Sequence, residues 1–162
     1  MGGLGLRERS LTTPYLKDYD AIAGNHPTDW ERRFDLSNWG LLSARLDGRR
    51  IGGAAVAFHT NGVDMLEGRR DLAVLWDLRV SPELRRRGVA SALFAAVEHW
   101  ARSRGCRQLK VETQNINVAA CRFYASQGCE LGAIHRFAYP DFPDEIQLLW
   151  YKDLSREDSP LA

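Results

Sequence analysis

A short basic stretch with one glycine, Arg85-Arg86-Arg87-Gly88-Val89-Ala90, has the composition of a phosphate-binding turn. Residues 74–80 before it form an apolar run of strand length, and apolar residues after it recur at helical spacing as far as Gly105. The first amides of a helix have no intrahelical partner, so they can hold phosphate oxygens. Gly88 would let a pyrophosphate approach the backbone, and the arginines would add charge-assisted hydrogen bonds. The same stretch also suits a solvated basic turn before an ordinary helix.

Glu112, Asn117 and Tyr124 follow with spacings that bring them together. Apolar residues alternate with polar ones from 108 to 113, so Glu112 lies on the strand face opposite the aliphatic side chains. Asn117 begins the next helix. Seven residues are nearly two helical turns, so Asn117 and Tyr124 project from almost the same face, about 10 Å apart along the axis. These two side chains can therefore line one groove.

Strands and helices alternate around these residues. The pair Asp47-Gly48 predicts a hairpin turn between the first two strands. The expected strands are Leu41 to Leu46, Ile51 to His59, Val74 to Val80, Gln108 to Thr113, Cys129 to Arg136 and Ile146 to Tyr151. The expected helices are one or two short ones between Pro14 and Asn38, then Gly88 to Arg104 and Asn117 to Gly128. This order predicts an α+β fold, a mixed sheet with helices on its faces.

Length, charge and cysteine content exclude several classes of protein. A chain of 162 residues without repeats or linkers is most simply one domain, and residues 1–13 and 155–162 are expected to be frayed ends. With 22 basic and 21 acidic side chains, the net charge of +1 argues against nucleic-acid and membrane partners. Three cysteines without a C-x-x-C pair, and four histidines without ligand spacing, predict neither disulfides nor a metal site.

The sequence also lacks the long apolar runs of exported and membrane proteins. No run approaches the roughly 18–20 residues of a membrane helix, and the N-terminus has no signal-peptide core. We therefore expect a soluble cytoplasmic protein, either a monomer or a homodimer.

Together these residues resemble the GCN5-related N-acetyltransferase (GNAT) superfamily. The phosphate-binding signature of that family, R/Q-x-x-G-x-G/A, reads Arg85-x-x-Gly88-x-Ala90 in this chain. The segment VETQNINVAACRFY, from Val111 to Tyr124, and the pair Trp150-Tyr151 are similar to the streptothricin acetyltransferase branch in particular. The resemblance covers about residues 72–151, and its two motifs are correctly spaced from each other. It implies a GNAT-like, mostly antiparallel sheet with a central splay between two parallel strands.

The resemblance implies acetyl-coenzyme A as acetyl donor, with its pantetheine arm between the splayed strands. Backbone groups of the strand before the basic turn would bind the arm, together with Asn117, and the amides from Arg86 to Ser91 would bind the pyrophosphate. Tyr124 matches the family's usual acid beside the departing sulfur, and Glu112 matches a position used as general base in some relatives. The residues expected at the cofactor are Leu78, Arg79, Val80, Arg85, Arg86, Arg87, Gly88, Val89, Ala90, Ser91, Asn117 and Tyr124.

Acetyl transfer to an amine requires that the amine lose a proton. An amine with a pKa of about 10.4 is neutral only ~10⁻³ to 10⁻⁴ of the time at pH 7, a penalty of about 4–5 kcal/mol. A carboxylate of ordinary pKa is a weak base for this step, so Glu112 is expected to act through water on an amine that the cleft desolvates. Holding amine and thioester together supplies much of the remaining acceleration.

Each of these residues also has a structural interpretation. Glu112 could be a solvated strand residue, Tyr124 a core aromatic and Asn117 only a helix cap. Asp77 could be the base, a carboxylate that binds the amine, or the partner of an arginine. Cys121 fits a small buried residue better than a nucleophile, so direct transfer is expected. The remaining acidic candidates are either solvated or, with Asp77 and Glu112, an acidic mouth for a cationic substrate: Asp141, Asp144 and Glu145.

The sequence thus predicts an acetyl-coenzyme A-dependent N-acetyltransferase that acts on a primary amine of a small cationic molecule, with a streptothricin-like antibiotic as the leading class. The enzymatic alternative is transfer to a protein N-terminus or lysine. An alternative of another class is a catalytically silent module that binds acyl-coenzyme A.

Overall fold

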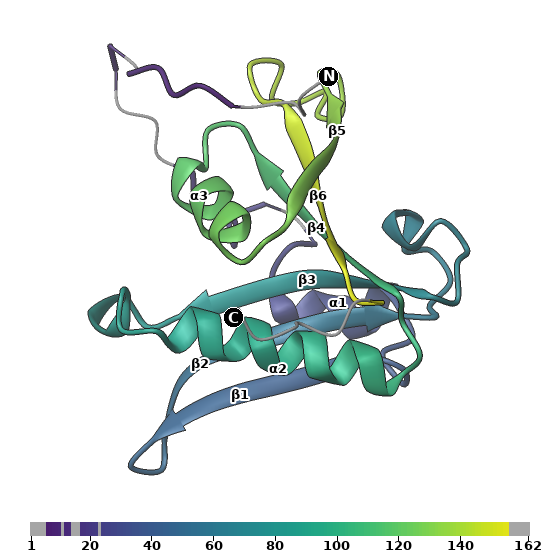
Figure 1. The fold of residues 1–162 in the computed structure, drawn as a ribbon. Coiled ribbons are helices and arrows are strands. Elements are labelled where there is room, and N and C mark those ends of the chain that lie inside the picture. Colours follow the sequence, from purple (N-terminus) through teal and green to yellow (C-terminus); the bar gives the residue numbers. More distant parts are fainter. Residues whose placement is uncertain (1–5, 11, 14–16, 23, 156–162) are drawn as a thin grey trace, which may run out of the picture.

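Six strands form one sheet in the order β1-β2-β3-β4-β6-β5 (Figure 1). The computed structural model describes residues 6–10, 12–13, 17–22 and 24–155. Neighbouring strands are antiparallel except β3 and β4, which are parallel. The strands are β1 (Gly40–Leu46), β2 (Arg49–Phe58), β3 (Leu72–Val80), β4 (Gln108–Gln114), β5 (Glu130–His135) and β6 (Gln147–Asp153).

The β1–β2 hairpin closes at the predicted turn. Asp47 and Gly48 both have positive φ, 49° and 80°, as a two-residue turn that matches the twist of its strands requires. The other strand boundaries differ from the expected ones by one or two residues, as usual where strands fray.

Helices cover both faces of the β1–β3 part of the sheet (Figure 1). Helix α2 (Val89–Ser103) packs on one face through Phe94, Val97 and Ala101, and α1 (Pro27–Arg33) packs on the other through Trp30. Alternate residues of β2 and β3 enter the two separate cores, which is why both strands read as continuous apolar runs. Helix α3 (Val118–Ser126) contributes Cys121 and Tyr124 to the core on the α2 side.

The parallel strands β3 and β4 pair over only part of their length. Their register runs from Leu72 opposite Gln108 to Leu75 opposite Val111. Beyond that point β3 continues to Val80 along β2, while β4 continues to Gln114 along β6. The sheet is therefore splayed at its centre, which confirms the predicted fold class. Among the described residues, one edge of β3 has no strand partner there.

In its described part, the region before β1 contains one short helix, where one or two were expected. Among the described residues between Pro14 and Asn38 there is one α-helix, α1, and residues 14–16 and 23 lie outside the description. Two further short helices of the 3₁₀ type, Asp64–Leu66 and Pro82–Leu84, precede β3 and α2. Of the ends expected to fray, residues 1–5, 11 and 156–162 lie outside the described residues, while residues 6–10, 12–13 and 155 are described and belong to no helix or strand. No helix in the described part is long and apolar enough to cross a membrane.

Lys110 is buried on β4, on the same strand face as Glu112. Its side chain is 1% exposed, and its Nζ donates to Glu67 Oε1 at 2.5 Å and to the Met65 carbonyl at 2.7 Å. The ammonium also lies 5.3 Å from the ring centre of Tyr151. The Glu67 carboxylate, by contrast, is half exposed. This ion pair ties the 3₁₀ turn before β3 to the middle of the sheet.

The two partners of this ion pair should contribute unequally to stability. Glu67→Gln leaves a buried ammonium without its counter-charge, so we expect the free energy of unfolding to fall by about 2 kcal/mol. Lys110→Met removes the buried charge and keeps an apolar stem, while Glu67 stays solvated, so its cost should be smaller. Urea denaturation measures both, and a larger loss for Lys110→Met would contradict this account.

Candidate active site

A cavity of about 610 Å³ lies where β3 and β4 part. It is lined from β3, β4, α3 and the described segment from residue 17 to 30. It brings together the predicted site residues Asp77, Leu78, Arg79, Arg85, Glu112, Asn117 and Tyr124. Val80 and residues 86–91 do not line this cavity and lie along the loop and first turn that lead into α2.

Glu112 is fixed by hydrogen bonds to both of its carboxylate oxygens. Oε1 accepts from the Tyr139 hydroxyl at 2.5 Å and, at 3.4 Å, from Gln114, while Oε2 accepts from Gln147 Nε2 at 2.7 Å. Burial, reinforced by the bond to Glu112, raises the pKa of the Tyr139 phenol far above its usual range. The phenol therefore remains a donor, and the carboxylate is held in one orientation. Glu112 is thus part of a polar network rather than a freely solvated strand residue.

Asp77 forms an ion pair with Arg79. Both Asp77 oxygens accept from Arg79 Nε, at 2.8 and 2.9 Å, and Arg79 Nη1 bonds Asp20 at 2.7 Å. Burial raises the pKa of Asp77 and the charge of Asp20 adds to the rise, while the guanidinium opposes it. Of the interpretations of Asp77, pairing with an arginine is the one that the structure contains. The Arg79 side chain is turned to these carboxylates.

Tyr124 is buried in the core, and the cavity reaches its side chain. It is 7% exposed and packs against Phe94 and Phe123, with ring centres 6.0 and 5.1 Å away. Burial raises the pKa of its phenol well above the ordinary value, so the group stays protonated at neutral pH. No partner of its hydroxyl is found in the described part of the chain, which leaves that proton available to a bound molecule.

Asn117 caps α3 and also faces the cavity. Its Oδ1 accepts from the Ala120 amide at 3.2 Å, and its Nδ2 donates to the Tyr19 hydroxyl at 3.5 Å. Asn117 can therefore cap the helix and line the cavity at the same time. Cys121, one turn further, is buried and bonds Thr113 at 3.4 Å, and burial raises the pKa of its thiol, as expected for a structural cysteine.

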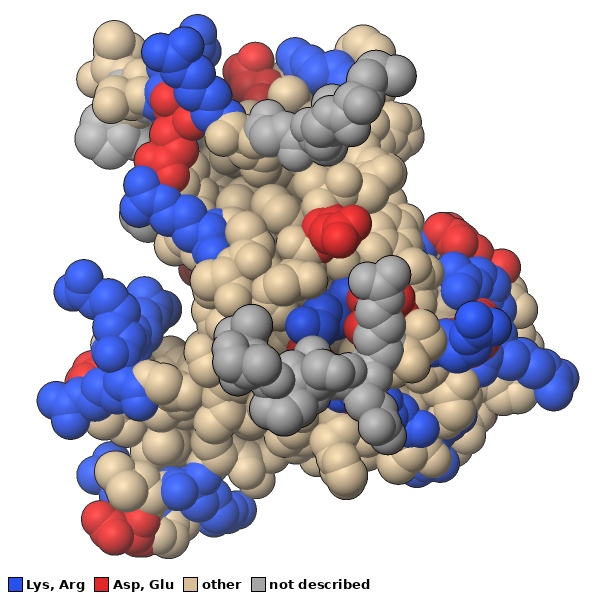
Figure 2. Space-filling view, in the orientation of Figure 1, with Lys and Arg blue, Asp and Glu red and all other residues tan. Residues whose placement is uncertain are grey.

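The start of α2 fits a pyrophosphate. Gly88 is the N-cap with φ of 81°, no side chain caps the first amides, and a Cβ at Gly88 would meet nothing within 4 Å. The flanking arginines and the first-turn residues Gly88 and Ser91 are exposed. Figure 2 shows basic side chains gathered at the left edge, where the β3–α2 loop lies in Figure 1, beside an indentation below α3. Open amides, empty space and local positive charge suit the phosphates of coenzyme A.

Sequence reasoning missed four residues of the site. Tyr139 and Gln147 hold Glu112 from the β5–β6 connection and from β6, and Tyr19 and Lys17 reach the cavity from the N-terminal segment. The sequence shows that residues 139–145 are aromatic and acidic, but Glu112, which bonds Tyr139, lies 27 positions away, and Lys17, which bonds Glu145, lies 128 positions away. Within the described residues no group of histidines, cysteines and carboxylates could hold a metal ion.

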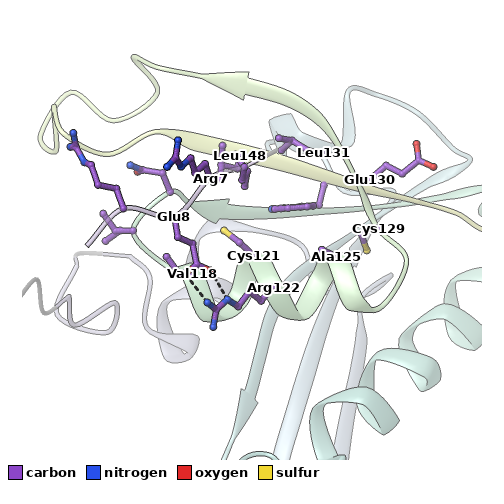
Figure 3. A pocket seen from close by; sticks show the side chains of 15 residues that line it. Arg7, Glu8, Val118, Cys121, Arg122, Ala125, Cys129, Glu130, Leu131 and Leu148 are labelled. Atoms are coloured by element: carbon purple, nitrogen blue, oxygen red, sulfur yellow. Dashed lines mark hydrogen bonds and ion pairs between the residues drawn. The ribbon is translucent and has the colours of Figure 1, made fainter. Parts of the chain in front are cut away.

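A second cavity, of about 890 Å³, lies between α3 and the β5–β6 pair (Figure 3). Its lining combines apolar residues such as Leu131 and Leu148 with charged ones, among them the ion pair of Glu8 with Arg122. It contains none of the predicted site residues. The smaller cavity at the splay is therefore the candidate active site.

Comparison with known proteins shows to which family this chain belongs. The model described as the acetyltransferase (GNAT) family matches residues 8–129, which is most of the chain. The chain belongs to this family, in agreement with the resemblance found in its motifs.

Two curated relatives narrow the comparison. Streptothricin acetyltransferase A of Bacillus subtilis is 32% identical over 108 residues, 65% of this chain and 57% of the relative. Aminoglycoside N(6')-acetyltransferase type 1 of Klebsiella aerogenes is 33% identical over 101 residues, 62% of this chain and 65% of the relative. The matches thus span less than two thirds of either relative.

One solved structure is similar in both sequence and fold. It is described as a putative streptothricin acetyltransferase from Bacillus anthracis in complex with acetyl coenzyme A. It is 28% identical, with a TM-score of 0.59, and the match covers 68% of this chain and 60% of that one.

The tyrosine network predicts how stability depends on pH. The folded-state pKa of Tyr139 lies above its unfolded value of about 10, so its contribution to stability is complete below pH 10 and is lost as the pH rises toward the folded pKa. Tyr19 and Tyr124 act in the same direction. Tyr139→Phe should therefore make the fall in unfolding free energy above pH 10 shallower than in the wild type. Urea denaturation between pH 9 and 11.5 tests this, and equal slopes would refute it.

Proposed function

We propose that this protein is an N-acetyltransferase that moves an acetyl group from acetyl-coenzyme A to a primary amine of a small cationic acceptor, with a streptothricin-like antibiotic as the leading class. The observation that carries the proposal is the cavity at the splay, which joins a fixed carboxylate, Glu112, to a buried protonated phenol, Tyr124. Family membership and the similarity to streptothricin and aminoglycoside acetyltransferases support it.

The cofactor would supply an activated thioester carbonyl. The amides at the start of α2 would bind its pyrophosphate, with Arg85, Arg86 and Arg87 neutralising charge at the rim. The unpaired edge of β3, at Leu78 and Val80, would bind its arm through backbone groups, and Asn117 would bind it from α3. These groups are in place before binding, so little ordering would be required of the protein.

Glu112 would take the proton that the attacking amine must lose. Two donors, Tyr139 from the β5–β6 connection and Gln147 from β6, orient its carboxylate, and a water between it and the amine could relay the proton. As the nitrogen bonds to the acetyl carbon and the carbon–sulfur bond breaks, the Tyr124 hydroxyl would donate to the departing thiolate. The raised pKa of that phenol keeps the proton in place until then.

Coenzyme A release by the purified protein tests the proposed function. With acetyl-coenzyme A present, release is expected with streptothricin and with other small polyamines, and to be much slower with peptides that carry a free N-terminus or lysine. Faster release with peptides would instead indicate that the acceptor is an amine of a protein. Binding of acetyl-coenzyme A with no release from any acceptor would favour a silent binding module.

Glu112 and Asp77 can be separated as candidate bases in the same assay. Glu112→Gln should lower kcat/KM by about 10²–10³-fold, because general-base assistance is lost while the shape of the side chain is kept. Asp77→Asn should cost less, because Asp77 is already paired with Arg79. The reverse order would assign the base to Asp77.

If the start of α2 binds the pyrophosphate, a methyl group at Gly88 should weaken the binding of coenzyme A. Gly88→Ala should raise the dissociation constant of coenzyme A about tenfold, because φ of 81° disfavours alanine and the methyl group would enter the space left for the pyrophosphate. The matched control is Gly105→Ala at the other end of α2, where φ is 76° and nothing lies within 4 Å of the added carbon. Calorimetric titration should find tight binding in the control; equal weakening in both would exclude this phosphate site.

A further inference from the structure

The ammonium group of Lys17 lies among three aromatic rings and a carboxylate. Its Nζ is 4.1 Å from the ring centre of Phe142, 5.3 Å from that of Tyr19 and 5.7 Å from that of Tyr139. It also donates to Glu145 Oε2 at 2.5 Å. The side chains of Lys17 and Glu145 are only 9% and 1% exposed. We call the set Tyr19, Tyr139, Phe142 and Glu145 the ammonium cage.

These are the groups that bind an ammonium ion when water is removed. Burying a cation is unfavourable unless opposite charge and polarised groups replace its hydration shell. The negative faces of aromatic rings and one carboxylate provide that replacement. Three of the four cage residues lie within one short stretch, 139–145, whereas Lys17 comes from more than 120 positions away. Most of the cage thus comes from a part of the chain far from Lys17, while Tyr19 lies two residues from it.

The cage adjoins the carboxylate proposed as the base. The Tyr139 ring faces Lys17, and the hydroxyl of the same residue donates to Glu112 at 2.5 Å. Lys17 and Tyr19 line the cavity that also holds Glu112 and Tyr124. One phenol ring therefore separates the cage from the expected reaction centre.

The other carboxylates of the loop do not share this position. Asp141 and Asp144 are exposed, whereas Glu145 is buried against Lys17. Of the three carboxylates on this loop, Glu145 is therefore the one buried against an ammonium group.

We propose that the ammonium cage is a subsite for a second ammonium group of a diamine or polyamine acceptor, and that Lys17 occupies it until such an acceptor displaces it. This inference rests on the proposed function. Exchange of one ammonium for another keeps the charge beside Glu145 balanced, so the buried carboxylate need never lose its cation. Lys17 is tethered and competes as an intramolecular ligand, so it lowers the apparent affinity for the acceptor.

Choline tests the cage without any acetyl transfer, because its quaternary ammonium cannot be acetylated and suits an aromatic cage. By calorimetric titration, Lys17→Ala should bind choline at least tenfold more tightly than the wild type. It should not gain affinity for 3,3-dimethyl-1-butanol, the neutral analogue of the same shape. Lys17→Arg keeps a competing cation and should behave as the wild type does. No gain in the Lys17→Ala protein would overturn the proposal.

Acceptor kinetics in variants that retain Lys17 give a second test, which holds even if Lys17→Ala does not fold. The ratio of kcat/KM for 1,5-diaminopentane to that for pentylamine should exceed one in the wild type and fall about tenfold in Phe142→Leu. The matched control is Phe137→Leu, because Phe137 is 82% exposed and outside the cage; its ratio should match the wild type.

The outcomes separate the two proposals. Turnover of pentylamine and the diamine with equal kcat/KM, in wild type and Phe142→Leu alike, would reject the subsite and keep the proposed function. Choline binding by Lys17→Ala with no turnover of any amine would reject the proposed function, and with it the assignment of the cage to an acceptor.

Discussion

The early end of pairing between β3 and β4 is the constraint on which the rest of the site depends. The two strands share a register for four residues and then follow different neighbours, β2 and β6. Backbone groups at a sheet edge need partners, so an edge left open in the middle of a sheet favours an extended ligand that can supply them. The cavity, the start of α2 and the cap of α3 all border this opening.

Polar side chains around the opening are held by one another. Glu112 accepts from Tyr139 and Gln147, and Asp77 is paired with Arg79, so the two carboxylates have different surroundings although both line one cavity. Orientation by these partners reduces the reorganisation that a reaction would require. The buried Lys110, two residues before Glu112 on β4, anchors that strand to the turn before β3. Side-chain contacts thus tie β4 both to the core, through Lys110, and to the candidate site, through Glu112.

Under the two proposals, Tyr139 would link the catalytic carboxylate to the subsite for the acceptor. Its hydroxyl holds the proposed base, and its ring forms part of the cage around Lys17. A change in the occupant of the cage would therefore act on the residue that orients Glu112. This coupling gives a physical route by which a cationic acceptor could be selected at the site where it reacts.

The sequence by itself determined the features that depend on neighbours along the chain. The Asp47-Gly48 turn, α2 after its glycine, the cap at Asn117 and the mixed sheet with its helices could all be predicted, because local hydrogen bonding and periodicity set them. The tertiary structure alone decided that Asp77 pairs with Arg79, that Tyr139 and Gln147 hold Glu112, and that Lys17 lies in an aromatic cage. Some of these contacts join residues up to 128 positions apart, and others depend on the direction in which the folded backbone points a side chain. Neither can be predicted from the pattern of neighbouring residues.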